Sequence, residues 1–172
     1  MTTSPFVIIR GAPGVGKTTV ADILKKQLLN GVCIEVDMLR LMVHANCWDD
    51  VGQHLAAIKL AAQIGQHYAA SGYGPVIIVD TFSFGTIQLL TNELRPFVPR
   101  IYSLVAEDST VAERIQQRKG HGYHDWRRSL VINRNIIENP AELEHTIDTT
   151  TMTPLHVAMD IVERERVSGG AE

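Results

Sequence analysis

The sequence has few cysteines, no long apolar run and no excess of basic residues, and each absence excludes a class of protein. Cys33 and Cys47 are the only cysteines among 172 residues, and they match neither a metal-binding spacing nor a secreted disulfide framework. No stretch of about 18 apolar residues occurs, and the first residues lack the charged and apolar regions of a signal peptide. We therefore expect a cytoplasmic protein without a membrane span, whose two thiols pack as small apolar groups.

The overall charge disfavours a nucleic-acid partner without excluding one. The net charge is -3 and the pI is near 6.2, so the chain has no general basic footprint, although a local basic patch stays compatible with these values. A length of 172 residues with 45% hydrophobic content suits one globular domain over residues 1–172. Repeats and low-complexity linkers are absent, and nothing in the sequence specifies an oligomeric state.

What the sequence does contain is a phosphate-binding loop. Residues 11–19, GAPGVGKTT, match the pattern G-x-x-x-x-G-K-[ST]. The loop lies between a predicted strand, Phe6–Arg10, and a predicted helix, Lys17–Leu29, as its mechanism requires. Glycines let the backbone approach phosphate oxygens closely, and the helix N-terminus contributes the positive end of its dipole. The sequence therefore predicts a nucleotide site.

The predicted nucleotide-binding residues have distinct tasks. We expect Lys17 to contact the β- and γ-phosphates and the Thr18 hydroxyl to hold Mg²⁺. The predicted loop residues are Gly11, Ala12, Pro13, Gly14, Val15, Gly16, Lys17, Thr18 and Thr19. A regulatory GTPase is a weaker interpretation, because the guanine-reading N-K-x-D is missing and Asp80 is followed by Thr81-Phe82-Ser83 rather than by D-x-x-G.

Apolar strands alternate with helical patterns along the rest of the chain. The further predicted strands are Val32–Val36, Val76–Asp80, Ile101–Val105 and Glu144–Ile147. The further predicted helices are Leu39–His44, Val51–Ser71, Thr86–Arg95, Thr110–Arg118, Trp126–Ile137 and Pro154–Arg166. This alternation predicts an α/β fold with a parallel sheet, helices on both faces and ligands at the carboxyl ends of the strands.

Two predicted strands deliver an aspartate to that edge of the sheet. Asp80 follows four apolar residues and fits the carboxylate that assists Mg²⁺, although a strand-end cap is the plainer alternative. Asp37 stands where a group that accepts the proton of a hydroxyl would be needed in phosphoryl transfer. Arg40 follows three residues later on the same helical face, so both side chains could grip one acceptor, or form an ordinary surface pair.

These segments together resemble a family of small kinases. GAPGVGKTT, VDMLR, VIIVDT and RIQQRKG occur in the same order and at similar spacing as in the kinase domain of phage-type polynucleotide kinases. Chloramphenicol phosphotransferase, gluconate kinase and shikimate kinase share the loop and the aspartate after the second strand. The resemblance implies a P-loop kinase fold, with a five-stranded parallel sheet in the order 2-3-1-4-5 flanked by helices and a mobile lid over about residues 114–128.

The resemblance also implies roles for single residues. It makes Asp37 the general base, Arg40 an acceptor-binding group, and Arg114 and Arg118 lid arginines that reach the transferring phosphate. The segment HTIDTTTMTP resembles the adenine-side strand and turn of such kinases, which implies ATP as the nucleotide, with contacts from Asp148 and Thr149.

The predicted lid contains further candidates. An i, i+4 spacing supports one shared face for Arg114 and Arg118, although a solvated helix face is the plainer alternative. Arg127 and Arg128 are additional lid candidates. His121 and His124 have the spacing of a metal pair, but two histidines without further ligands are more often ordinary surface residues.

The expected function is an ATP-dependent, Mg²⁺-dependent phosphotransferase acting on a hydroxyl of a small molecule, such as an antibiotic or another natural product. A polynucleotide 5′-hydroxyl kinase is the alternative, and a nucleotide-binding module without transfer is a third reading. The segment after Arg40 mixes polar and apolar groups that suit a partly apolar pocket, namely Met42, His44, Trp48, Asp49, Asp50 and His54. Its apolar positions Leu55, Ile58, Ala62 and Ile64 equally suit the core.

Overall fold

One parallel sheet forms the centre of the molecule. The structure is a computed structural model that describes residues 4–28, 30–118 and 124–169. Five strands lie in the order β2-β3-β1-β4-β5, which confirms the predicted order. Their bounds are β1 Phe6–Gly11, β2 Val32–Glu35, β3 Val76–Asp80, β4 Arg100–Val105 and β5 Glu144–Asp148. Each neighbouring pair runs parallel, so the carboxyl ends of all five strands meet at one edge.

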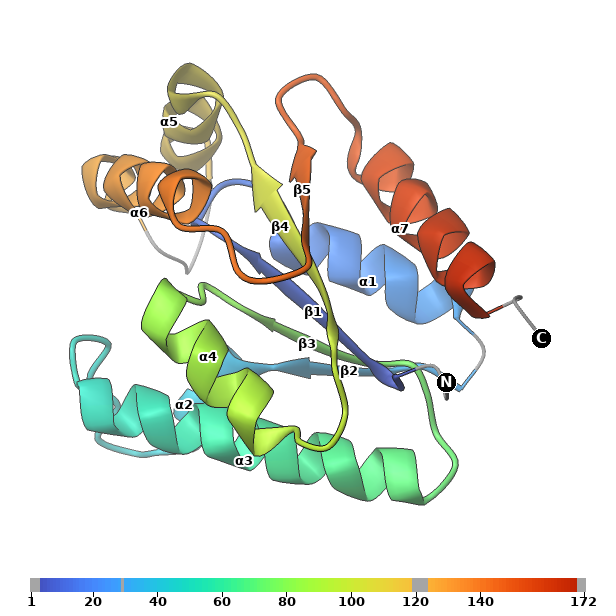
Figure 1. The fold of residues 1–172 in the computed structure, drawn as a ribbon. Coiled ribbons are helices and arrows are strands. Elements are labelled where there is room, and N and C mark those ends of the chain that lie inside the picture. Colours follow the sequence, from blue (N-terminus) through green and yellow to red (C-terminus); the bar gives the residue numbers. More distant parts are fainter. Residues whose placement is uncertain (1–3, 29, 119–123, 170–172) are drawn as a thin grey trace.

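Helices cover both faces of the sheet (Figure 1). Their bounds are α1 Lys17–Gln27, α2 Val36–Arg40, α3 Val51–Ala70, α4 Phe84–Glu93, α5 Asp108–Gln116, α6 Trp126–Glu138 and α7 Pro154–Gly169. The pair α1 and α7 lies on one face, and α3 and α4 lie on the other beside the short α2. Helices α5 and α6 pack together near the ends of β1 and β4. Within the described residues, no helix is long and apolar enough to cross a membrane.

An apolar core lies on each face of the sheet, because successive side chains along a strand point to opposite faces. Val7 and Ile9 of β1 point to the face covered by α1 and α7, whereas Phe6 and Ile8 point to the face covered by α3 and α4. Because both faces are covered, the central strands β1 and β3 are buried along their whole length and are mostly apolar, as parallel strands usually are, whereas the edge strand β5 is largely exposed.

One predicted element differs from the structure over most of its length, while the others differ by at most a few residues at their ends. The helix expected over Leu39–His44 is wrong in its bounds: α2 begins at Val36, directly after β2, and ends at Arg40. Asp37 therefore lies in the first turn of a helix rather than at the end of a strand. Residues 41–50 instead form turns up to α3, whose first turn is capped by the Asp50 carboxylate accepting from the Gln53 amide. This cap explains why the helix starts at Val51.

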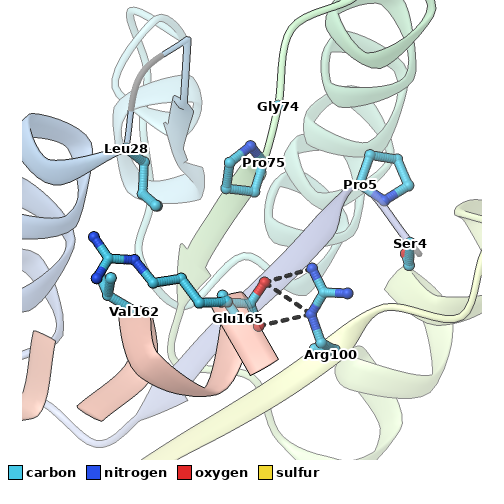
Figure 2. A pocket seen from close by; sticks show the side chains of 9 residues that line it. Ser4, Pro5, Leu28, Gly74, Pro75, Arg100, Val162 and Glu165 are labelled. Carbon is cyan, nitrogen blue, oxygen red and sulfur yellow. Dashed lines mark hydrogen bonds and ion pairs between the residues drawn. The ribbon is translucent and has the colours of Figure 1, made fainter. Parts of the chain in front are cut away.

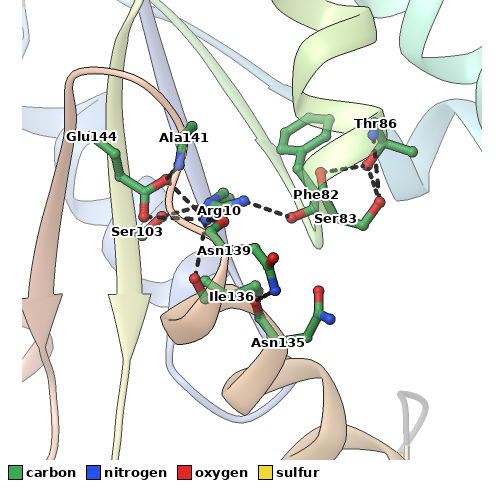
Figure 3. A network of polar contacts seen from close by, with 10 residues as sticks. All are labelled: Arg10, Phe82, Ser83, Thr86, Ser103, Asn135, Ile136, Asn139, Ala141 and Glu144. Carbon is green, nitrogen blue, oxygen red and sulfur yellow. Dashed lines mark hydrogen bonds and ion pairs between the residues drawn. The ribbon is translucent and has the colours of Figure 1, made fainter.

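A buried arginine links the sheet to the end of α6 (Figure 3). Arg10 in β1 has no exposed surface, and its Nε donates to Ser103 Oγ at 2.6 Å. Its two terminal nitrogens donate to the carbonyl oxygens of Phe82, Ile136 and Asn139. The same guanidinium pairs with the Glu144 carboxylate at 2.9 Å. Each donor group of this buried cation therefore has an acceptor, and three elements are held to β1.

A small cavity of about 300 Å³ lies at the amino ends of the strands (Figure 2). Arg100 Nε donates to Glu165 Oε1 at 2.6 Å, and the Tyr102 hydroxyl donates to the same oxygen at 2.8 Å. These contacts attach α7 to β4. The cavity lies opposite the edge at which ligands bind in open parallel sheets, so it is not the nucleotide site.

Candidate active site

The loop between β1 and α1 has the backbone that phosphate binding requires. Gly14 and Gly16 have backbone φ angles of 92° and 99°, which residues with a side chain rarely adopt. A Cβ at Gly11 would lie 2.5 Å from the carbonyl oxygen of Leu104, so β4 packs directly against this glycine. At Gly16 there is room for a side chain, since no atom lies within 4 Å of a Cβ built there. Glycine is required at this position by the backbone conformation.

A cavity of about 1,170 Å³ opens beside this loop. Its lining brings together most of the predicted site residues: Pro13, Gly14, Val15, Gly16, Lys17, Thr18, Thr19, Asp37, Arg40, Asp80, Arg114, Arg118 and Thr149. Gly11, Ala12 and Asp148 do not line it. Of the segment after Arg40, Leu41, Trp48, Asp49 and His54 line the cavity, whereas Met42, His44 and Asp50 do not.

Lys17 is a lining residue of this cavity. Its Nζ donates to the carbonyl oxygen of Ala12 at 3.0 Å. Burial lowers the pKa of Lys17 to about 8, and the carboxylates of Asp80 and Asp37 only partly offset that effect. An anionic group beside Lys17 would stabilise its charged form and raise this pKa again.

Carboxyl groups line the same cavity as Lys17. Burial by the surrounding protein, followed by the charge of Asp80, raises the pKa of Asp37, while Lys17 and Arg40 act against this rise. Glu35, two residues earlier, accepts a hydrogen bond from Thr18, and burial together with Asp22 raises its pKa. A raised pKa makes a carboxylate a stronger proton acceptor.

Asp80 has a partner that the sequence did not reveal. Its Oδ2 lies 2.6 Å from His54 Nε2, at the start of α3, and the Asp80 side chain is only 4% exposed. The pair lies in the same cavity as Lys17 and Asp37.

Arg40 is buried and holds the chain that follows it. One terminal nitrogen donates to the carbonyl oxygens of Cys47 at 3.1 Å and Trp48 at 2.9 Å. Its guanidinium carbon also lies 4.6 Å from the centre of the Trp48 ring. The structure therefore places Arg40 in the cavity wall as a support for residues 41–50, besides its predicted contact with an acceptor.

The predicted lid arginines lie in different environments. Arg114 in α5 donates to the side-chain and backbone oxygens of Thr149, at 3.1 and 2.8 Å. Arg118 lies beyond the end of α5, which stops at Gln116 and not at Arg118 as predicted. Arg128 pairs with Asp49 across the cavity at 3.0 Å, whereas Arg127 contacts the Trp126 ring. His121 lies outside the described residues, and His124 is exposed.

The adenine-side prediction concerns two residues that are both engaged within the protein. Thr149 Oγ1 is buried within hydrogen-bond distance of the carbonyl oxygens of Val15 and Val105, at 3.1 and 3.0 Å. The Asp148 carboxylate accepts from the backbone and hydroxyl of Thr150. Thr149 thus connects the phosphate loop to the end of the sheet.

The oxygen groups beside the loop suit a magnesium ion. Thr18, Glu35, Asp37 and Asp80 supply hydroxyl and carboxylate oxygens to one cavity, and Mg²⁺ prefers such ligands together with water and phosphate oxygens. In the part of the chain that the structure describes, no three His, Cys, Asp or Glu side chains form a protein-only metal cage. A nucleotide phosphate completing the coordination fits this arrangement.

A glycine-rich loop between a central strand and a helix, in a sheet of order 2-3-1-4-5, defines the fold of P-loop kinases. The chain belongs to the AAA domain family AAA_18, whose model matches residues 7–136. No significant match occurs among curated protein sequences.

Solved structures of kinases and of a tunicamycin resistance protein have the same fold. A sugar kinase from Janibacter sp. HTCC2649 has a TM-score of 0.74 and 15% identity, with 97% of each chain covered. The tunicamycin resistance protein of Deinococcus radiodurans has a TM-score of 0.71 and 24% identity over 94% of this chain and 95% of that chain. Shikimate kinase from Acinetobacter baumannii has a TM-score of 0.68 and 13% identity over 99% and 97%.

Sequence reasoning missed Glu35, which lines the cavity, and two pairings between residues that it did name. Glu35 is the last residue of β2, and no motif in the sequence singles it out. The pairing of His54 with Asp80 and of Arg128 with Asp49 had no local signal, since these partners are 26 and 79 residues apart.

Proposed function

We propose that residues 1–172 act as one kinase domain that transfers the γ-phosphoryl group of ATP, with Mg²⁺, to a hydroxyl of a small molecule such as an antibiotic or another natural product. The observation that carries this proposal is that Lys17 and Asp37 line one cavity beside the phosphate loop and act electrostatically on each other. A protein that only binds nucleotide has no need of a carboxylate there.

Each residue has a defined task in the proposed reaction. Residues 13–19, which include Lys17, hold the phosphates, and Thr18 and Asp80 would hold Mg²⁺. Asp37 orients the acceptor hydroxyl and takes its proton as the oxygen bonds to the γ-phosphorus. The bond from phosphorus to the β,γ-bridging oxygen breaks, and ADP leaves with that electron pair. When bound, Mg²⁺ neutralises charge on the phosphate oxygens.

Arg118 and Arg114 are the proposed cations for the transferring group. Arg118 lines the cavity and acts electrostatically on Lys17. Arg114 would first have to release Thr149, which makes it the less direct of the two. Residues 119–123 of the proposed lid lie outside the described residues.

The test is phosphorylation of an acceptor panel with labelled ATP. The panel contains hydroxylated antibiotics, nucleosides, sugars and oligonucleotides with a 5′-hydroxyl, and Lys17→Ala protein is the control. We expect labelling of a small molecule that the control does not support. Strong labelling of oligonucleotides that weakens steeply with salt would instead favour the polynucleotide alternative. Absence of any labelled acceptor would contradict the proposal.

A further inference from the structure

Trp48 is an exposed aromatic side chain in the wall of the cavity. It lines the cavity although half of its surface, 50%, faces solvent. A large aromatic ring left half exposed beside a nucleotide site lacks the burial that usually stabilises such a side chain.

One face of this ring is already supported. The Arg40 guanidinium lies 4.6 Å from the ring centre, and the same side chain donates to the Trp48 carbonyl oxygen. Cys47 is held in addition by Arg40 and by the Gln53 side chain, which accepts from its amide at 2.9 Å. The indole is therefore held in place before a ligand arrives, which lowers the entropic cost of binding against it.

No aromatic ring of the described residues stacks on the opposite face. Among the described residues, the only ring or cation contact of Trp48 is the one with Arg40. Leu41, which is 54% exposed, lines the same cavity. An apolar and planar surface is thus available on the acceptor side.

The charges around this surface select against anions. Glu35, Asp37, Asp49 and Asp80 all line the cavity, whereas the Arg40 cation is buried behind the indole. Lys17, Arg114 and Arg118 also line the cavity, and the proposed reaction assigns them to the nucleotide phosphates, while Arg128 pairs with Asp49. With these cations on the nucleotide, the carboxylates of Glu35, Asp37 and Asp80 are the charges left for the acceptor, and they repel an anion.

We propose that Trp48 is the acceptor-binding surface of the cavity, and that the acceptor is an uncharged or cationic hydroxyl compound with a planar ring that stacks on the indole face opposite Arg40. The ring would lie against Trp48 and Leu41, and its hydroxyl would be directed toward Asp37. This inference rests on the proposed function and narrows its acceptor class.

Direct binding tests this inference without phosphoryl transfer. Trp126→Phe leaves Trp48 as the only tryptophan, and its emission reports binding of four probes: phenyl, cyclohexyl and methyl β-D-glucosides, and phenyl β-D-glucuronide. We expect the phenyl glucoside to bind about 10-fold more tightly than the methyl glucoside, from stacking. The cyclohexyl glucoside should bind more weakly than the phenyl, because it lacks a planar ring, and the anionic glucuronide should also bind more weakly.

Substitutions of Trp48 provide a second experiment, in which binding of the same probes is measured by calorimetry. Trp48→Leu should remove the preference for phenyl over methyl glucoside, and Trp48→Phe should retain part of it. Circular dichroism and binding of a fluorescent ADP analogue establish that each variant is folded.

Equal affinity for phenyl and methyl glucosides, preference for the glucuronide, no binding of any probe, or an unchanged preference in Trp48→Leu would each overturn the inference. Failure of the proposed function would instead be seen as loss of ADP-analogue binding or of acceptor labelling in protein that still prefers the phenyl probe.

Discussion

Asp37 is the side chain on which the proposed phosphoryl transfer depends. Asparagine keeps its size but cannot take a proton, so we expect Asp37→Asn to lower acceptor phosphorylation by about 10² to 10⁴-fold. Affinity for a fluorescent ADP analogue should change little, because the phosphate loop is intact. If Asp37 only favours the first turn of α2, the variant will lose at most about 1 kcal/mol of stability and keep its activity.

Asp37→Asn therefore needs both measurements on one protein sample. Near-normal phosphorylation with unchanged ADP binding would remove the general base from the mechanism.

The buried charge of Lys17 lowers the free energy of unfolding of the protein. Its pKa is lowered to about 8 from 10.5, so between these values the unfolded chain binds more protons than the folded one. The cost of burying the charge is therefore fully present below about pH 8 and is relieved as pH rises toward 10.5. We expect Lys17→Met to raise the melting temperature at pH 7 by roughly 3 °C, while turnover is lost.

Comparison of the two proteins across pH tests this sign. The stability advantage of Lys17→Met should shrink between about pH 8 and pH 10. An advantage that stays constant over that range would show that the charge of Lys17 carries no such cost.

At the scale of elements, Arg10 connects β1 to the end of α6 and to Glu144 at the start of β5 (Figure 3). Arg10→Met would leave a carboxylate that is 1% exposed without its cation, as well as unpaired carbonyl oxygens. We expect a loss of about 3–5 kcal/mol in the free energy of unfolding, measured with urea.

A second substitution separates the buried charge from lost packing. Arg10→Met combined with Glu144→Gln removes the unpaired charge, so it should be at least about 1 kcal/mol more stable than Arg10→Met alone. Additive losses in the double variant would mean that the ion pair contributes nothing.

For the whole molecule, nucleotide binding should be visible as stabilisation. A nonhydrolysable ATP analogue with Mg²⁺ at about 100 times its Kd adds about 2.7 kcal/mol to the free energy of unfolding. For a chain of this size that corresponds to roughly 5 to 10 °C in melting temperature. Lys17→Met should show little of this shift under the same conditions, and an equal shift in both proteins would place the nucleotide elsewhere.

The sequence alone determined what depends on neighbouring residues. The glycine spacing before Lys17 predicts the phosphate loop, and the run Val76–Asp80 predicts β3 with the same bounds. Both succeed because backbone conformation and burial period are set within a few residues. The same local logic placed Asp37 and Asp80 at one edge of the sheet, since parallel strands finish together.

Only the tertiary structure decided which side chains meet across that edge. His54 reaches Asp80, Arg114 reaches Thr149, and Arg40 supports Trp48 instead of lying free beside Asp37. Even α2 starts earlier than its own pattern predicts, because Val36 is buried against α3 and the sheet. A contact near 3 Å depends on how helices pack on the sheet, and small displacements of a helix make or break it, so no local pattern in the chain encodes it.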